Sequence, residues 1–296
     1  MASAAPWRVI DIINWGKKYF AEKGIESPRL TIELLLSHVL GCSRMGLYSA
    51  FERLLAGRQL AELKDCVKRK AGREPLQYIT GKAQFMGLEL DVGPGVLIPR
   101  PETEQMVSII IEYYKMKPAP KRILDIGCGS GCIAVSLAKA LPDAAVMCID
   151  ISPEALKTAA ANAAKNHAAN VSFALCDILK NHASIPYIDS KRYDLVVSNP
   201  PYIDKAEHDL LDPEVRIYEP AEALTDFGDG LTFYRQYARI FRDVLTEVGI
   251  FFVETGWGQK KVISDIFDAA GIENDILNDF GGVPRFLTNA RIFPKN

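Results

Sequence analysis

The chain has 296 residues, of which 48% are hydrophobic and 24% charged, with a formal net charge of −2. This length can bury one large core, or one core with a small appended domain, and the balanced charge argues against nucleic-acid binding through bulk electrostatics. The six cysteines form no CxxC pair and the four histidines are scattered, so no metal site or disulfide framework is indicated. The sequence contains no signal-peptide pattern and no long apolar run, so we expect a soluble, cytoplasmic protein that does not enter a membrane.

Helical periodicity dominates residues 1–75, where we predict a small helical domain. Val9, Ile13 and Phe20 recur at helical spacing in the first helix. A second helix is expected from Ser27-Pro28, with the serine as its cap, to Gly41, which can close it.

A further helix is expected over about residues 58–71, and basic side chains gather around it. They are Arg53, Arg58, Lys64, Lys68, Arg69, Lys70 and Arg73. They form either a solvated helix face, which is the commoner meaning of a charge run, or a local patch for a partner.

After Leu76 the helical pattern gives way to short runs in which apolar and polar residues alternate, separated by Gly81 and Gly87. This predicts a β-hairpin linker over residues 76–98, whose strands occupy the stretch from Leu76 to Val92. The prolines and glycines of residues 93–104 then impose a fixed extended path before a helix begins near Glu102.

Strands and helices alternate beyond this junction. Strands are expected at residues 122–126, 145–149, 171–175, 193–198 and 249–254, and helices at 131–140 and 153–166. This alternation predicts an α/β domain over residues 99–296, with a doubly wound, mostly parallel sheet covered on both faces. After about Asn274, two further strands joined through Gly281-Gly282 predict an antiparallel pair at one edge.

A glycine loop joins the first of these strands to its helix. Its glycines, Gly127, Gly129 and Gly131, allow a tight turn and the close approach of a nucleotide-type cofactor. A dinucleotide fingerprint would have glycine or alanine where this chain has Cys132, which disfavours NAD.

Acidic residues follow the second and third strands of the series. Asp150 offers acceptors for two ribose hydroxyls, and Ser152 is expected to cap the next helix in its place. Asp177 is a candidate partner for an adenine amino group, with Ile178 as an apolar ring contact. The alternative places Asp177 in an exposed turn.

The residues Asn199-Pro200-Pro201-Tyr202, here called the Asn199 corner, follow the strand at 193–198. A rigid Pro-Pro turn at a strand's carboxyl end fixes carbonyls and one carboxamide where open α/β sheets place their ligands. This apparatus suits a flat amino group, although Asn-Pro in isolation commonly only starts a turn. The corner itself contains no histidine or carboxylate that is an evident general base.

The glycine loop, Asp150 and the Asn199 corner together resemble class I methyltransferases that use S-adenosylmethionine to modify planar nitrogens. Upstream segments narrow the resemblance. Residues 75–81 (PLQYITG), 85–88 (FMGL) and 94–104 (PGVLIPRPETE) look like the hairpin and junction of the bacterial peptide chain release factor glutamine methyltransferases. Residues 33–36 (ELLL), 218–221 (YEPA) and 229–231 (DGL) are also similar to that family.

This resemblance implies a seven-stranded class I methyltransferase sheet with an antiparallel edge strand, and S-adenosylmethionine as cofactor. It implies methylation of the side-chain amide nitrogen of the glutamine in the Gly-Gly-Gln motif of class 1 release factors, which the helical domain would bind. The cofactor residues it implies are Gly127, Cys128, Gly129, Ser130, Gly131, Asp150, Asp177, Ile178 and Asn199. The glutamine would be received by Asn199, Pro200, Pro201 and Tyr202, of which Asn199, Pro200 and Tyr202 are the predicted catalytic residues.

Two alternatives stay open. A nucleic-acid adenine methyltransferase would use the same corner on a flipped base, although no stable nucleic-acid partner is expected for this slightly acidic chain. A non-catalytic binding protein could retain the same fold. Arg100 and Glu102 either order the junction over the cofactor or form a structural ion pair.

Overall fold

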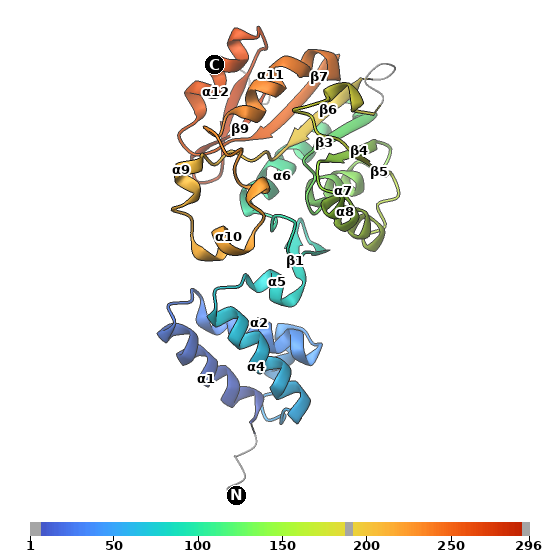
Figure 1. Ribbon diagram of the computed structural model, residues 1–296. Coiled ribbons are helices and arrows are strands. Elements are labelled where there is room, and N and C mark those ends of the chain that lie inside the picture. The colour runs from blue at the N-terminus through green and yellow to red at the C-terminus, as the bar shows by residue number, and fades with distance from the viewer. Residues whose placement is uncertain (1–6, 187–191, 292–296) are drawn as a thin grey trace, which may run out of the picture. The chain divides into compact units, whose positions relative to one another are not determined.

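The computed structural model describes residues 7–186 and 192–291, and these form two compact units (Figure 1). The first unit runs to Gly81 and also takes in Pro213–Tyr218. The second comprises Lys82–Asp212 and the residues from Glu219 onward. The short segment 213–218, which the sequence pattern had assigned to the α/β domain, therefore packs with the helical unit.

The first unit is helical and encloses its own apolar core. Its helices are α1 (Val9–Glu22), α2 (Pro28–Leu40), α3 (Arg44–Ser49), α4 (Gly57–Ala71), α5 (Leu76–Thr80) and α10 (Pro213–Tyr218). The predicted end of α2 is confirmed, since Gly41 adopts φ +60°. The predicted Ser27 cap is wrong: Ser27 lies in the left-handed region at φ 47°, and its side chain makes no capping hydrogen bond.

A buried carboxylate joins helices α2 and α3 of this unit. The Glu33 side chain is fully buried and accepts hydrogen bonds from Arg29 Nε at 2.8 Å, Arg44 Nε at 2.7 Å and the Tyr48 hydroxyl at 2.8 Å. Burial opposes ionisation, but these donors outweigh it and hold the pKa of Glu33 below its ordinary value. Glu33 thus has a structural role within the helical unit.

The linker is a hairpin shorter than the one we predicted. Strands β1 (Lys82–Phe85) and β2 (Leu88–Asp91) pair antiparallel, but Leu76–Thr80 forms helix α5 where a strand was expected. Pro75 precedes this helix, the Thr80 hydroxyl bonds the Leu76 carbonyl at 3.0 Å, and Gly81 ends it at φ +73°. Helical packing of this five-residue stretch, with Tyr78 and Ile79 buried, overrode its β-like composition.

A seven-stranded sheet forms the centre of the second unit, in the order β5-β4-β3-β6-β7-β9-β8. Its strands are β3 (Arg122–Ile126), β4 (Ala145–Asp150), β5 (Val171–Leu175), β6 (Tyr193–Ser198), β7 (Leu245–Glu254), β8 (Asp275–Asn278) and β9 (Pro284–Thr288). The pairs among β5, β4, β3, β6 and β7 are parallel, and β9 is antiparallel to both β7 and β8. The predicted mostly parallel sheet with an antiparallel pair at one edge is confirmed.

Helices cover both faces of this sheet (Figure 1). One core cluster contains residues of α6 (Pro101–Lys115), α7 (Cys132–Ala140) and α8 (Pro153–Lys165), and the other contains residues of α11 (Thr232–Val244) and α12 (Lys260–Ala269). Successive strand residues alternate between the two, as Ile123 and Leu124 do. The remaining short elements are α9 (Lys205–His208), η1 (His182–Ser184) and η2 (Ala221–Ala223).

The register of the parallel strands decides which loops become neighbours. Ile126 of β3 is paired with Ser198 of β6, and Ser198 is paired in turn with Val253 of β7. The Ser198 hydroxyl also donates to the Ile126 carbonyl at 2.7 Å. The residues that follow these three strands therefore emerge side by side at the carboxyl edge of the sheet.

Candidate active site

The glycine loop between β3 and α7 has two kinds of glycine. Gly127, Gly129 and Gly131 all have positive φ, at 73°, 53° and 78°. A Cβ atom added to Gly131 would lie 2.9 Å from the Ala159 Cβ of α8, whereas one added to Gly127 or Gly129 would meet nothing within 4 Å. Gly131 thus permits close helix packing, and the other two leave open space beside the backbone, as a bound ligand requires.

Asp150 orders this loop from the end of β4. Its Oδ2 accepts the Gly129 amide at 2.9 Å, and its Oδ1 accepts the Ser152 amide at 2.9 Å. Each oxygen keeps a further acceptor position, and burial raises the pKa of the carboxyl group. The predicted cap is confirmed, since Ser152 Oγ accepts the Ala155 amide at 3.2 Å.

A buried side-chain atom at the start of the loop lacks a partner. Asp125, the fourth residue of β3, accepts the Ala134 amide through Oδ2 at 3.2 Å, while its Oδ1 has no hydrogen-bond partner among the described residues. Burial, with a contribution from the charge of Asp150, raises the pKa of Asp125 to about 7. An unsatisfied buried acceptor is rare in native proteins, so this loop has room for one more donor.

The residues after β5 lie at the same edge. Asp177 Oδ1 accepts the Leu179 amide at 3.0 Å, and Lys180 Nζ lies 3.1 Å from its Oδ2. Ile178 is only 4% exposed and packs in the second core cluster, so it offers little area to a ligand. Ile151, which directly follows Asp150, is 60% exposed and offers more. The sequence reasoning did not select Ile151, although an apolar residue next to Asp150 was a visible signal.

The Asn199 corner lies beside the glycine loop and is held by residues far away in the sequence. Asn199 Nδ2 donates to Thr103 Oγ1 at 3.0 Å, and the Thr103 hydroxyl donates to Glu254 Oε2 at 2.6 Å. The Tyr202 hydroxyl donates to the other Glu254 oxygen at 3.2 Å. Glu254 ends β7, next to the corner in the parallel register.

Glu254 is a carboxylate at the corner that the sequence reasoning missed. It is 1% exposed, and burial raises its pKa to about 7. Its two oxygens are already occupied by Thr103 and Tyr202. The sequence shows no carboxylate within residues 199–202. In the structure, Glu254 of β7 brings a carboxylate to the corner from another strand.

Two further segments support the corner. Gly230, at φ +74°, lies against the Tyr202 carbonyl, which an added Cβ would approach to 2.4 Å. Gln259 Nε2 donates to the same carbonyl at 2.9 Å. The close approach of the Tyr202 carbonyl explains why residue 230 is a glycine.

Arg100, at the end of the extended junction, forms an ion pair. Its Nη2 lies 2.7 Å from Glu219 Oε1, and Glu219 Oε2 accepts the Ile98 amide at 3.2 Å. The Glu219 side chain is 2% exposed. Arg100 therefore forms an ion pair, but its partner is Glu219. The expected pair of Arg100 with Glu102 is not among the ion pairs of the described residues.

The hairpin reaches the glycine loop through a buried asparagine. Asn162 of α8 exchanges two hydrogen bonds with the Asp91 backbone, at 2.7 and 2.9 Å, and donates to the Ser130 carbonyl at 2.9 Å. Asn162 thus connects the end of the hairpin to the glycine loop by hydrogen bonds.

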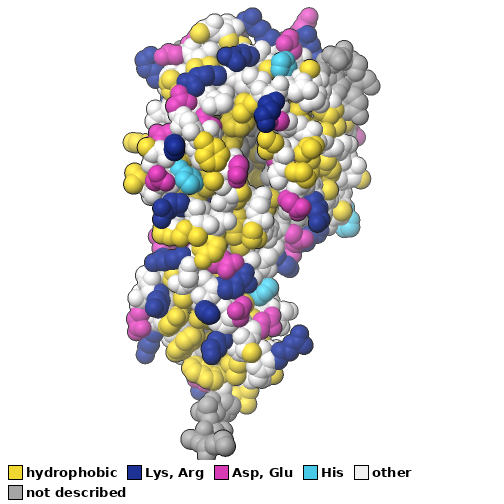
Figure 2. All heavy atoms as spheres, viewed as in Figure 1, with side chains coloured by type: hydrophobic (Ala, Val, Ile, Leu, Met, Phe, Trp, Pro, Cys, Tyr) yellow, Lys and Arg dark blue, Asp and Glu magenta, His cyan; other side chains and the backbone are white. Residues whose placement is uncertain are grey.

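The basic cluster around α4 is partly used inside the helical unit. Arg69 pairs with Glu74, Lys70 is buried against Glu214, and Arg73 donates to two backbone carbonyls. On the face shown in Figure 2, Lys and Arg side chains are interspersed with Asp and Glu. Arg69, Lys70 and Arg73 thus make contacts within the helical unit that neither alternative for the charge run included.

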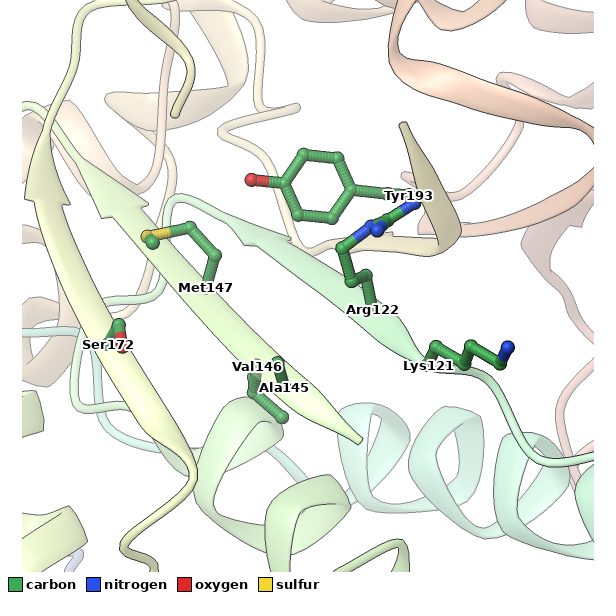
Figure 3. Close-up of a pocket in the computed structure, with 7 residues that line it drawn as sticks. All are labelled: Lys121, Arg122, Ala145, Val146, Met147, Ser172 and Tyr193. Atoms are coloured by element: carbon green, nitrogen blue, oxygen red, sulfur yellow. The ribbon is translucent and has the colours of Figure 1, made fainter. Parts of the chain in front are cut away.

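A cavity of about 360 Å³ lies near the amino ends of the parallel strands, whereas the glycine loop and the Asn199 corner follow their carboxyl ends (Figure 3). It is lined by the first residues of four strands and the residue before β3: Lys121, Arg122, Ala145, Val146, Met147, Ser172 and Tyr193. None of the predicted site residues lines it. Within residues 7–186 and 192–291, no cluster of three His, Cys, Asp or Glu side chains is arranged to hold a metal ion, and no helix is long and apolar enough to cross a membrane.

Known proteins resemble this chain along most of its length. Family models described as the PrmC N-terminal domain and a methyltransferase domain match residues 11–81 and 119–277. Proteins named release factor glutamine methyltransferase from Geobacter sulfurreducens and Bacillus subtilis are 43% and 37% identical, over 90% and 94% of this chain and 90% and 96% of theirs. A third, from Fusobacterium nucleatum, is 36% identical over 94% of this chain and 77% of its own. This chain therefore belongs to the release factor glutamine methyltransferase family.

Proposed function

We propose that this protein methylates the side-chain amide nitrogen of the glutamine in the Gly-Gly-Gln motif of class 1 release factors, with S-adenosylmethionine as methyl donor. The observation that carries the proposal is the shared edge of the sheet. The pairing of Ile126 with Ser198 puts the glycine loop directly beside the Asn199 corner. The proposed site for the methyl donor and the proposed site for the substrate amide are thus adjacent, as methyl transfer between them requires.

The residues of the loop fit this cofactor. Gly127 and Gly129 leave open space along the backbone, Asp150 retains acceptors for a ribose diol, and Asp125 Oδ1 awaits a donor. S-adenosylmethionine supplies a methyl group on a positively charged sulfur, from which a nucleophile can displace it. We assign the methionine part to residues 127–131, the ribose to Asp150, and the adenine to Asp177. Ile151 would be the main apolar contact of the adenine, since Ile178 is largely buried.

The corner must make a poor nucleophile react, because the lone pair of a carboxamide nitrogen is delocalised into its carbonyl. In the proposed mechanism Asn199 Oδ1 and the Pro200 carbonyl each accept one N–H of the substrate amide, Tyr202 packs on its flat face, and Pro201 keeps the turn rigid. A neutral hydrogen bond contributes only about 0.5–1.5 kcal/mol, whereas fixed attack geometry can supply roughly 7–11 kcal/mol. Positioning is therefore the main contribution of the corner.

The helical unit, predicted over residues 1–75, is proposed to bind the release factor. It exposes an aromatic ridge in which the Trp15 ring stacks on Tyr19, with centroids 5.2 Å apart, and meets Trp7 edge-on at 6.0 Å. Trp7 and Trp15 are 37% and 41% exposed. Exposed, mutually rigidified aromatic rings are typical anchors of protein interfaces.

Asn199→Ala tests the proposed role of the corner. We expect the variant to retain S-adenosylmethionine binding by calorimetry but to lose most of its methylation of a purified release factor. Undiminished methylation would refute the orientation role. Wild-type protein that binds no cofactor would instead support the non-catalytic alternative.

A further inference from the structure

We propose that Thr103 and Glu254 are positioning residues: the Glu254 carboxylate, acting through the Thr103 hydroxyl, fixes which end of the Asn199 carboxamide meets the substrate. The inference rests on the proposed function, because it explains how the corner presents an acceptor to a substrate amide. Thr103 and Glu254 both lie outside residues 199–202 in the sequence.

A carboxamide has two ends of nearly equal size and opposite hydrogen-bonding character. Only the oxygen of Asn199 can accept a substrate N–H, and a flipped side chain would direct its own N–H groups at the substrate. The corner therefore works in one of the two orientations. Something must distinguish between them, and the proline turn constrains only the backbone.

The hydrogen bonds on the far side of Asn199 make this distinction. The Thr103 hydroxyl has one proton, and an ionised Glu254 has none, so the Glu254 oxygen 2.6 Å away can then only accept. Thr103 must then donate to Glu254, so its oxygen is left to accept from Asn199, at 3.0 Å. A flipped Asn199 would bring two acceptors together and lose a hydrogen bond in a site where Thr103 is 2% exposed.

The same carboxylate also orients Tyr202. The phenol donates to Glu254 Oε1 at 3.2 Å, and the Tyr234 hydroxyl donates to the Glu254 carbonyl at 2.9 Å, which fixes the end of β7. The Glu254 carboxylate thus orients the hydrogen-bonding groups of two corner side chains, Asn199 through Thr103 and Tyr202 directly. Since both of its oxygens are engaged by the protein, Glu254 acts through other residues and is not a group that touches the substrate.

The charge state of Glu254 links this orientation to pH. The titratable and charged groups that face it are Tyr202, Glu102 of α6, Cys132 of α7, Tyr234 of α11 and Arg285 of β9. Burial raises the pKa of Glu254 to about 7 against the opposing hydrogen bonds from Thr103 and Tyr202 and the charge of Arg285. A protonated Glu254 can donate to Thr103, which frees the Thr103 proton for the Asn199 oxygen and permits the flip. Turnover should therefore rise with pH through about 7.

Thr103→Val removes the hydroxyl while nearly conserving volume, and Thr103→Ser keeps the hydroxyl. We expect Thr103→Val to lower kcat for release factor methylation about 10-fold or more, from the loss of a buried hydrogen bond, with cofactor affinity unchanged and the pH dependence near 7 flattened. Thr103→Ser should restore most of kcat. Ser108→Ala, which removes a hydroxyl five residues further along α6, should retain wild-type kcat.

A double-mutant cycle separates positioning from a merely structural effect. In single-turnover measurements, Thr103→Val added to Asn199→Ala should cause no further loss, because Thr103 acts only through Asn199. Fully multiplicative losses in the double variant, or wild-type kcat in Thr103→Val, would overturn the proposal.

Side-chain amide NMR of Asn-labelled protein tests the orientation without any substrate. The Asn199 signals, assigned by their absence in Asn199→Ala, should shift with a midpoint near pH 7 and include one slowly exchanging proton. Both properties should disappear in Thr103→Val and persist in Thr103→Ser. Signals unaffected by Thr103→Val would refute the inference, whereas a wild-type protein that methylates no release factor would refute the proposed function alone.

Discussion

Gly131→Ala and Gly129→Ala change the same loop but should affect different properties. The first should mainly lower stability, and the second should mainly lower cofactor affinity. An alanine at Gly131 keeps φ near +78° and brings its Cβ to 2.9 Å from Ala159 Cβ and 3.1 Å from Ala159 Cα. The left-handed conformation costs an alanine about 1–2 kcal/mol, and overpacking adds about 1–3 kcal/mol. Since the Ala159 Cα belongs to the backbone of α8, it cannot move aside cheaply. We expect a total loss of about 2–5 kcal/mol in the stability of the second unit.

Gly129→Ala is the matched control. Its φ of +53° carries a similar conformational cost, but an added Cβ meets nothing within 4 Å. We expect a loss of only about 1–2 kcal/mol in stability. The added methyl group would occupy the space assigned to the cofactor, so cofactor affinity should fall at least about 10-fold.

Hydrogen exchange of β3 and β4 measures the stability of the second unit locally, which avoids assuming that both units unfold together. Calorimetry with S-adenosylmethionine measures the affinity. The assignment of the glycines would be refuted if Gly131→Ala left exchange unchanged, or if Gly129→Ala bound the cofactor as the wild type does.

Four further predictions concern single side chains. Asp150→Asn should weaken cofactor binding about 10- to 100-fold by calorimetry, through the loss of charged acceptors, while Asp143→Asn in the exposed turn before β4 should not. Because the pKa of Glu254 is raised in the folded state, its protonated form stabilises the fold, and that stabilisation is lost as pH rises from about 4.5 through about 7. Hydrogen exchange should therefore show the wild type losing about 3 kcal/mol relative to Glu254→Gln over this range, and parallel pH curves would contradict the assignment. Arg100→Ala should destabilise the second unit by about 1–3 kcal/mol in denaturant titrations, since Glu219 is left buried without its cation, and Arg100→Lys should recover part of this. Trp15→Ala should weaken release factor binding by calorimetry without changing cofactor affinity, whereas Met45→Ala, at a 77% exposed position outside the ridge, should change neither.

The strands of the parallel sheet were predictable because each is a short apolar run bounded by turn residues. The expected strands at 122–126, 171–175 and 193–198 coincide with β3, β5 and β6. Most side chains of β3 and β6 are apolar and buried because helices cover both sides of the sheet. The glycine loop and the Asn199 corner followed from their position at the ends of these strands.

Local misassignments arose where packing or backbone conformation overrode composition. Residues 76–80 carry a β-like pattern but fold as α5, with Tyr78 and Ile79 buried. Ser27 is a suitable cap by residue type, yet its backbone is left-handed and its side chain makes no capping hydrogen bond. Residue preferences alone cannot anticipate either result.

The supporting residues of the corner were missed because their contacts are non-local. Thr103 and Glu254 reach Asn199 across 96 and 55 positions of sequence, and only the register of β6 and β7 makes Glu254 its neighbour. A signal was present: Glu254 ends an apolar strand run, as Asp150 does. Recognition of an acid at each strand end, once the strand order is known, would have found it.

The most direct test of the proposed function is to locate the transferred methyl group. Wild-type protein would be incubated with labelled S-adenosylmethionine and an equimolar mixture of a class 1 release factor and adenine-containing DNA, and both would be analysed by mass spectrometry. We predict label on the side-chain nitrogen of the Gly-Gly-Gln glutamine, and far less label when Asn199→Ala replaces the wild type. Label on DNA adenine, or on a release factor residue other than that glutamine, would contradict the proposal.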